Sequence, residues 1–501
     1  MVRKLATISH KAHGQVKHEA DLDQALEVAG LGCHNLWSCF VLTLVSISTA
    51  LDQMGYAVVL PPAACELQIS DQARGFIIAM PYIGVLLSSH AWGYLVDTQG
   101  RKKTVIFSTL GNGLFGAGAA FMPNLTSFII CKGFSALCLA GPASIPYTYI
   151  SEIVPPKYRD IMLSLMNSVM LVGTVLATPF AWAILPQEFA IDFGAYIFRP
   201  WRLLTIACSI PLLISSILLI FNPESPKYLI TQDKHEEALQ VLRNMYAVNK
   251  RRSPEDYPIS RLTNISLPNE KESLFTSIKS HTLPLLKWTY SKWMLLNAFL
   301  LFGTFNVLNG LYIWVPEVVN RVFSGGEDNG RTPCQVITQG LNQTMAGEQC
   351  NNALEDRTLM ISTIAQTSLA LFVMIVSCVI KFMSKKTMII ICFWVIGLAC
   401  ILVNFITNQI VFAIILSALI ITILNVGCVN AYTVDLIPTH LRGMAVTVSM
   451  TLGMTGSIAG STMAGYMIKD ACEPMFYTFG GLLILCGGLS FLLPSSRNLK
   501  N

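Results

Sequence analysis

The chain has 501 residues, of which 53% are hydrophobic and only 13% are charged. This balance excludes an ordinary water-soluble protein, because most of the chain would be insoluble without lipid. The formal net charge of +5 does not indicate a nucleic-acid partner, since the basic residues fall in the segments between apolar stretches.

Residues 1–35 are polar and are predicted to form a cytosolic N-terminus. They lack the short apolar region and small-residue cleavage site of a secretory signal, so the first apolar stretch is expected to remain as a helix. Twelve apolar stretches follow, each close to the roughly 20 residues that span a bilayer. They lie near 36–60, 74–96, 104–122, 126–149, 161–184, 201–221, 293–316, 358–380, 387–406, 409–432, 444–468 and 475–493.

The distribution of basic residues predicts the topology. Most of the 34 Lys and Arg residues lie in segments on the same side as the N-terminus. By the positive-inside rule, both termini are therefore expected in the cytosol. The membrane is expected to be the plasma membrane or that of an intracellular vesicle, and the sequence leaves this choice open.

Two ionisable residues lie inside predicted helices of the first half. Asp52 lies in the first stretch, and Lys132 lies in the fourth, which runs in the opposite direction. At roughly 1.5 Å per residue, both are ~9–12 Å below the outer ends of their helices. Such residues are costly in a membrane and mark a pathway or relay. Three interpretations stay open: a proton-coupling pair, a static pair that fixes helix packing, or no contact.

One long polar segment, 222–292, divides the stretches into two sets of six. The predicted fold class is an all-α membrane protein with twelve transmembrane helices in two six-helix bundles, 36–221 and 293–493. Within the cytosolic linker, helical spacing of apolar residues predicts a surface helix over 233–247. Residues 494–501 are predicted to form a cytosolic tail.

The segment 317–357 is predicted to be a large loop outside the membrane. Its sequon at Asn342 is a candidate glycosylation site. Cys334 and Cys350 share this loop and are predicted to form a disulfide in an oxidising lumen. The sequence contains no CxxC pair or His/Cys cluster with metal spacing, so neither a metal nor a cofactor is predicted.

Four sequence elements resemble the major facilitator superfamily. They are GYLVDTQGRKK (Gly93 to Lys103), EIVPPKYRD (Glu152 to Asp160), NPESPK (Asn222 to Lys227) and TVDLIPTHLRG (Thr433 to Gly443). In the resembled fold, the Gly/Asp/Gly element joins the second and third helices at a tight turn. The resemblance implies conformational gating by Gly93, Asp97, Gly100, Arg101, Glu152, Arg159, Asp435 and Arg442.

AWAILP (Ala181 to Pro186) and GLYIWVP (Gly310 to Pro316) are similar to the synaptic vesicle glycoprotein 2 branch of that superfamily, which is related to organic cation transporters and sugar porters. The resemblance implies that helices one and four line a cavity with Asp52 and Lys132. Amide and aromatic side chains could bind solute there, although each taken singly is more often a packing residue. The candidates are Gln53, Tyr56, Trp182, Asn306, Asn309 and Trp314.

The chain also departs from that branch. Residues 1–35 and 317–357 stand where the branch has a long cytosolic N-terminus and a large luminal domain, so a synaptic role is not carried over. The expected function is secondary-active transport of a small organic solute, with protons as a possible coupling ion, by a monomer in the lipid bilayer. The alternative is a transport-inactive binding or trafficking protein. An enzyme is not expected, because the sequence has no nucleophile–base set or phosphate-binding loop.

Overall fold

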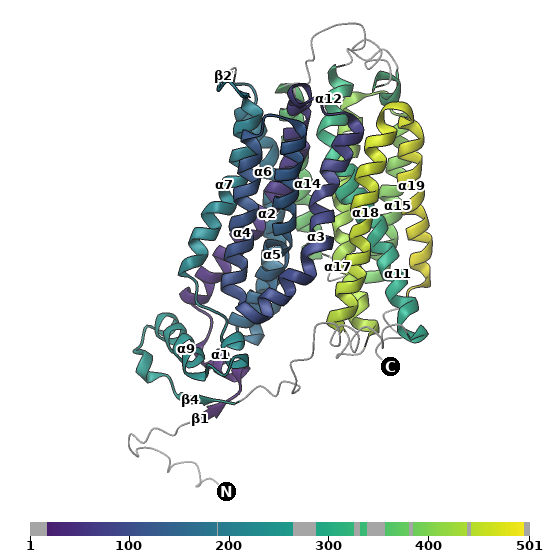
Figure 1. Cartoon of the computed structure of the whole chain (residues 1–501). Coiled ribbons are helices and arrows are strands. Elements are labelled where there is room, and N and C mark those ends of the chain that lie inside the picture. Colours follow the sequence, from purple (N-terminus) through teal and green to yellow (C-terminus); the bar gives the residue numbers. More distant parts are fainter. Residues whose placement is uncertain are drawn as a thin grey trace.

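The computed structural model describes residues 18–187, 189–263, 287–324, 331–337, 356–379, 384–437 and 442–494. Over these residues the protein consists of long helices and four short strands. Figure 1 shows two groups of helices standing side by side, one from the first half of the chain and one from the second.

Six long helices form the first group. They are α2 (Cys33–Leu67), α3 (Asp71–Gln99), α4 (Arg101–Gly118), α5 (Leu125–Ile153), α6 (Pro156–Ile184) and α7 (Pro200–Leu218), with the 3₁₀ turns η1 (Ala119–Phe121) and η2 (Leu219–Phe221). Polar residues cap two of them: Ser70 accepts a hydrogen bond from the backbone of Ala73 at 3.2 Å, and Asn124 caps α5 in the same way. Gly100 separates α3 from α4, because its φ of +96° strains residues with a Cβ.

The second group is more irregular. It comprises α11 (Trp288–Phe305), the π-helix η5 (Asn306–Leu311), η6 (Tyr312–Trp314), α12 (Val315–Ser324), α14 (Asp356–Val379), α15 (Lys385–Leu402), η8 (Val403–Phe405), α16 (Gln409–Ser417), η9 (Ala418–Thr422), α17 (Ile423–Leu436), α18 (Arg442–Asp470), α19 (Cys472–Leu489) and η10 (Ser490–Leu492). The predicted seventh stretch is therefore a continuous helical run made of α11, η5, η6 and α12. The predicted tenth stretch is a similar run made of α16, η9 and α17.

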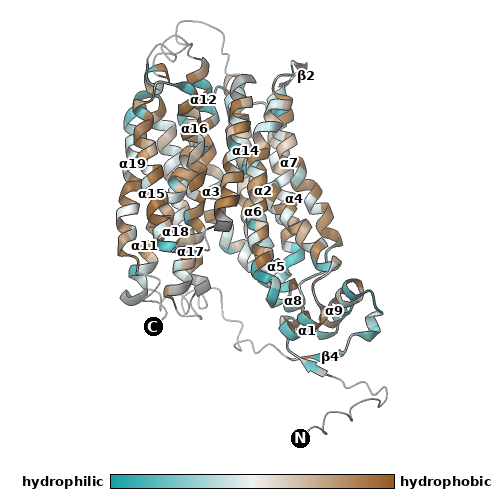
Figure 2. Cartoon of the chain, turned by 180° about the vertical axis from the view of Figure 1, so that it is seen from behind, coloured by the Kyte–Doolittle hydropathy of each residue, from teal (hydrophilic) through white to brown (hydrophobic). Residues whose placement is uncertain are grey.

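Each of the twelve predicted stretches coincides with one of these helices or helical runs. Among the described residues, ten helical segments are long and apolar enough to cross a membrane, and Leu359–Val373 in α14 forms a shorter apolar helix. Figure 2 shows apolar residues along both groups, whereas hydrophilic residues gather at the end that carries α1, α8, α9 and β4. We call this end the α9 end and the opposite one the disulfide end.

A small module of helices and strands covers the first group at the α9 end. It contains α1 (Leu22–Ala29), α8 (Pro226–Thr231), α9 (His235–Lys250), the turn η3 (Pro254–Asp256), and the strands β1 (His18–Ala20) and β4 (Ile259–Leu262), which pair in parallel. The predicted linker helix is observed as α9. Its apolar stripe packs inward, with Ala238, Leu239, Leu242 and Met245 buried.

Two asparagines attach this module to the membrane helices. Asn249 of α9 donates hydrogen bonds to the Asn35 side chain at 2.6 Å and to the backbone carbonyl of Gly30 at 2.8 Å. Asn35, at the start of α2, donates to the backbone carbonyl of Ile153 at 2.7 Å. The asparagines therefore connect α9, the α1–α2 turn and the end of α5.

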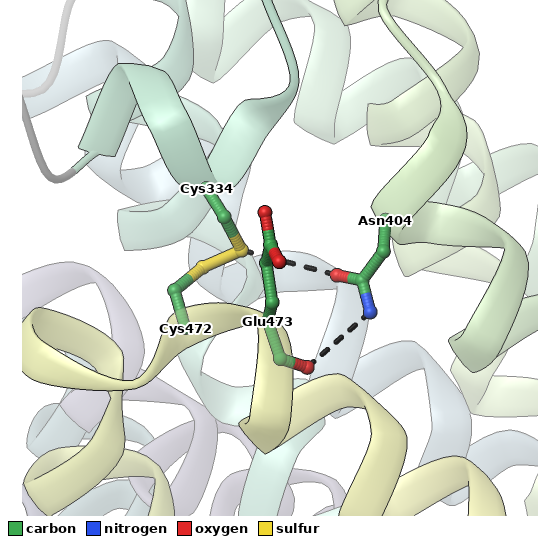
Figure 3. Close-up of a disulfide and its surroundings, with 4 residues drawn as sticks. All are labelled: Cys334, Asn404, Cys472 and Glu473. Carbon is green, nitrogen blue, oxygen red and sulfur yellow. Dashed lines mark hydrogen bonds between the residues drawn. A yellow bond between two sulfur atoms is a disulfide. The ribbon is translucent and has the colours of Figure 1, made fainter.

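Cys334 forms a different disulfide from the predicted one. It is bonded to Cys472 at the start of α19, with the two Cα atoms 5.5 Å apart, so the predicted bond to Cys350 is wrong. Asn404 lies beside this disulfide and donates a hydrogen bond to the backbone carbonyl of Glu473 at 3.3 Å (Figure 3). The fold brings the start of α19 next to Cys334, which sequence proximity does not indicate. Cys350 and the sequon Asn342 lie outside the described residues.

Cys65, at the C-terminal end of α2, is also disulfide-bonded. A short antiparallel hairpin of β2 (Ile191–Asp192) and β3 (Ile197–Phe198) connects α6 to α7 at the same end. Figure 1 places this hairpin and α12 at the opposite end from α9, as the predicted topology requires.

Candidate functional site

Asp52 and Lys132 form a buried ion pair inside the first group of helices. The Lys132 Nζ atom lies 3.6 Å from Asp52 Oδ1, and the two residues are 3% and 5% exposed. The pair joins α2 to α5. This agrees with the sequence analysis, which placed Asp52 and Lys132 at a similar depth by counting residues from the outer ends of their helices. Of the three interpretations of these residues, lack of contact is therefore wrong.

The surroundings of the pair are only partly polar. Ser209 of α7 donates a hydrogen bond to Asp52 Oδ1 at 3.4 Å, and the Lys132 Nζ atom lies 4.5 Å from the centre of the Tyr56 ring. A small cavity adjoins the pair, with room for about one water molecule. Its lining comes from α2, α5 and α7: Asp52, Gly55, Tyr56, Val59, Leu60, Phe128, Lys132, Thr205 and Cys208.

The contacts of the pair are long for a buried carboxylate. One cation at 3.6 Å and one hydroxyl at 3.4 Å leave Asp52 Oδ1 without a short charge-assisted hydrogen bond, which is normally about 2.7–2.9 Å. The pair therefore lacks the close geometry of the strongest buried ion pairs.

The predicted solute-binding residues do not gather around one cavity in the part of the chain that is described. Tyr56 belongs to the Asp52–Lys132 group, and the adjacent Gln53 is half-buried. Asn306 and Asn309 lie on η5 and connect it to α18, donating to the Gly456 carbonyl at 3.3 Å and to Ser457 Oγ at 3.1 Å.

The two predicted tryptophans lie in different environments. Trp182 on α6 is 45% exposed, whereas Trp314 is 1% exposed. The guanidinium of Arg74 lies 5.8 Å from the centre of the Trp314 ring. Trp314 is therefore packed against an inter-helix charge cluster, not presented to an open pocket.

That charge cluster connects the two groups of helices, and it was not predicted. Arg74 of α3 lies 2.6 Å from Glu317 of α12, and Arg321 of α12 lies 2.6 Å from Asp71 of α3. Arg321 also donates to Glu317 at 2.8 Å. We call these four residues the inter-half cluster. Its formal charges sum to zero, so each buried charge has a partner of opposite sign.

Close backbone packing accompanies the cluster. A Cβ atom on Gly75 would lie 2.8 Å from the Ser461 carbonyl oxygen, and one on Gly465 would lie 2.7 Å from that of Asp71. Glycine is therefore needed on both sides where α3 meets α18. Thr178 of α6 also donates to Gln366 of α14 at 3.3 Å. The two groups are in contact toward the disulfide end, and their ribbons diverge toward the α9 end (Figure 1).

At the α9 end, the predicted gating motif forms a network within the first group. Arg101 donates to both carboxylate oxygens of Glu152, at 2.9 and 3.1 Å, and lies 3.5 Å from Asp97. Glu224 accepts from the backbone N–H groups of Arg101 and Lys102 at 2.9 and 3.1 Å. This carboxylate thereby occupies the N-terminus of α4, where the helix dipole favours negative charge.

Tyr228 of α8 joins this network from outside the membrane helices. Its hydroxyl donates to the Thr98 carbonyl at 3.0 Å, and the Arg101 guanidinium lies 5.5 Å from its ring centre. Burial, and after it the negative charge of Glu224, raises the pKa of Tyr228. The phenol therefore stays protonated and able to donate.

The remaining motif residues are placed differently. Arg159 forms an exposed ion pair with Asp23 of α1 at 3.1 Å and is not part of the Arg101–Glu152 network. A Cβ atom on Gly93 would meet nothing within 4 Å. Asp435 and Arg442 fall on α17 and α18, but their side chains lie outside the described residues. Among the residues that the structure describes, no group of His, Cys, Asp and Glu could hold a metal ion.

Comparison with known proteins agrees with this architecture. A family described as Major Facilitator Superfamily matches residues 42–330. The synaptic vesicle glycoprotein 2C of Mus musculus is 28% identical over 245 residues, which cover 48% of this chain and 34% of the relative. The matched region thus spans about a third of the length of this curated relative.

Solved structures extend the similarity of the fold to nearly the whole chain. The partially occluded inward-open conformation of the xylose transporter XylE from E. coli superposes with a TM-score of 0.65 at 15% identity, covering 93% of this chain and 99% of that one. A D-xylose-proton symporter gives a TM-score of 0.63 at 15% identity, with the same coverage of both chains.

Proposed function

This chain belongs to the major facilitator superfamily, and from that membership we propose that it carries a small organic solute across a membrane by alternating access. The observation that carries the proposal is the inter-half cluster. Alternating access requires two bundles that rock against each other around a central region. The cluster closes one end with ion pairs and hydrogen bonds, which can break and form again.

The packing at the disulfide end supports a reversible contact. Two ion pairs hold the bundles together, Arg74 to Glu317 and Asp71 to Arg321, each at 2.6 Å. In addition, α3 meets α18 through glycines. Small residues at such a crossing let two helices approach and slide. The positive-inside rule supports placing the α9 end in the cytosol, and with that orientation the contact at the disulfide end is proposed to close the outer side.

Asp52 and Lys132 are the proposed coupling residues. A proton can drive transport only if it binds the outward- and inward-facing states with different affinity. The buried pair provides such a difference if its separation changes as the helices α2 and α5 move. The proton symport named for one of the structural neighbours supports this proposal by analogy of fold alone.

The solute is proposed to be small and organic. The Asp52–Lys132 pair does not indicate whether the solute is charged. Asp52 and Lys132 neutralise each other, so neither anions nor cations are favoured at this position. Asn309 and Gln53, which are half-buried, are the proposed polar contacts, and Trp182 is the proposed aromatic contact because its ring is 45% exposed.

Uptake by the purified full-length chain in proteoliposomes tests transport itself. Vesicles are incubated with a mixture of small metabolites, with and without an inward-directed pH gradient, and their contents are compared with those of protein-free vesicles. We expect at least one solute to accumulate saturably. If no solute enters under either condition, the transport-inactive binding or trafficking protein becomes the better account.

A further inference from the structure

The hairpin between α6 and α7 carries several exposed apolar side chains. In its register Ile191 pairs with Phe198, and Asp192 pairs with Ile197. Because cross-strand partners share a face and side chains alternate along a strand, Ile191 and Phe198 fall on the face opposite Asp192 and Ile197. The rings of Phe193 and Phe198 are 6.3 Å apart, and we call Ile191, Phe193 and Phe198 the aromatic face.

The tip of this hairpin contacts the start of α7. Tyr196, next to the turn, lies over the Arg202 guanidinium at 4.6 Å from its ring centre. Arg202 is in the first turn of α7 and is fully buried, where it is held by Glu66 at 2.6 Å. The tip of the hairpin is therefore fixed at the level where the membrane helix α7 begins.

Much of the aromatic face has no cover within the described chain. Phe193 is 60% exposed and Ile191 is 53% exposed. Phe198 contacts Phe121 at 6.4 Å between ring centres, and Phe121, in the turn η1 that follows α4, is itself 47% exposed. Leu114, earlier on α4, is 55% exposed within a segment that is long and apolar enough to cross a membrane. The aromatic face thus continues the exposed apolar surface of a membrane helix.

We propose that this hairpin lies in the interfacial layer of the lipid leaflet at the disulfide end, with its aromatic face against the boundary between headgroups and acyl chains. Aromatic side chains concentrate in that layer, and amphipathic segments lie flat in it with the apolar side down. Asp192 is on the opposite face, where it accepts a hydrogen bond from the Gly194 backbone at 2.7 Å and meets water. The inference is independent of whether the chain transports a solute.

Fluorine NMR in lipid nanodiscs tests the depth of the hairpin. Phe193→4-trifluoromethylphenylalanine places one reporter on the aromatic face, and the same substitution at Ile191 provides a second reporter. Phe115, 40% exposed on α4, serves as the lipid-facing control, and Val248, 49% exposed on α9, serves as the water-facing control. Each full-length variant is measured with lipids carrying a headgroup nitroxide and, separately, with a water-soluble gadolinium chelate.

We expect the headgroup nitroxide to remove most of the fluorine signal at positions 193 and 191, while the chelate leaves it largely intact, as at Phe115. The opposite pattern, matching Val248, would show that the hairpin stands in water and would overturn the proposal. Protection from both agents would show that protein covers the face, and would overturn it as well.

Discussion

The inter-half cluster and the Asp52–Lys132 pair differ in how close their opposite charges lie. In the inter-half cluster, opposite charges lie as close as 2.6 Å and several are linked to two partners. In the Asp52–Lys132 pair the separation is 3.6 Å. A buried ion pair stabilises a fold only when geometry and additional hydrogen bonds offset its desolvation. In the cluster, Arg321 meets this condition through hydrogen bonds to Glu317 and Asp71, whereas the Asp52–Lys132 pair has only longer contacts.

Loss of one member of the pair should therefore destabilise the protein through the charge left behind. We expect Lys132→Ala to lower the free energy of unfolding by about 3–5 kcal/mol, the usual cost of leaving a buried charge unpaired. Adding Asp52→Asn should recover much of this loss. Thermal unfolding in detergent measures both effects, and equal stability of Lys132→Ala and the wild type would show that Asp52 has another partner or is neutral.

The inter-half cluster should control opening at the disulfide end. Glu317→Gln leaves a net positive charge between Arg74 and Arg321, so we expect the state closed at this end to lose population. The measurement is the rate at which a membrane-impermeant maleimide labels Thr462→Cys, whose site on α18 lies beside Gly75. A cost of about 1.4 kcal/mol corresponds to a tenfold rise in labelling.

Glu473→Gln, which changes an exposed carboxylate at the same end, is the matched control and should leave the labelling rate unchanged. An unchanged rate in Glu317→Gln as well would mean that the cluster does not hold the bundles together.

At the scale of elements, the sequence predicts the long helices well and their local distortions poorly. The twelve apolar stretches and the linker helix α9 follow from length and periodicity alone. The short helix α1 and the strands β1 and β4 do not, because they depend on contacts between segments that lie far apart in the sequence: α1 and β4 pack against α9, and β1 pairs with β4. The π-helix η5 likewise has no local signal, since its side chains are held by hydrogen bonds to α18.

The disulfide illustrates the same limit and leads to a stability prediction. Cys334 and Cys472 are separated by 138 residues, so only the assembled bundle brings them together. Cys334→Ser and Cys472→Ser should each lower the free energy of unfolding by about 2–5 kcal/mol, and the double variant should be no less stable than either. Unfolding under non-reducing conditions tests this expectation, with Cys486→Ser as a control for a free thiol. Additive losses would contradict the pairing.

The crossing of α3 and α18 should not tolerate a larger residue. A Cβ atom on Gly75 would lie 2.8 Å from a backbone oxygen that cannot move independently, so Gly75→Val should keep the bundles apart at the disulfide end. We expect slower uptake and faster labelling of Thr462→Cys. Gly481→Ala on α19, where an added Cβ would meet nothing within 4 Å, should behave as the wild type. Normal uptake by Gly75→Val would exclude this crossing as part of the moving interface.

At the scale of the whole molecule, predictions were correct where the thickness of the bilayer relates the position of a residue in one helix to its depth in another. Asp52 and Lys132 could be paired because antiparallel helices cross the same thickness, so counting residues gives depth. The solute-binding residues could not be fixed in this way, since Asn306 and Trp314 serve packing as readily as binding. The inter-half cluster was missed because its i,i+3 and i,i+4 spacings indicate helix surfaces but do not identify the facing helix.

The most direct test of the account is uptake by Asp52→Asn in proteoliposomes, once a solute has been identified with the wild type. Asparagine keeps the shape of the side chain and its contact with Ser209 but cannot gain or lose a proton. The wild type and Asp233→Asn, an exposed control, should both accumulate the solute when a pH gradient is applied. Asp52→Asn should lose this accumulation and still exchange internal for external solute, because exchange requires no net proton movement. Accumulation by Asp52→Asn at the wild-type level under the same gradient would show that the Asp52–Lys132 pair is structural and would contradict the proposed coupling.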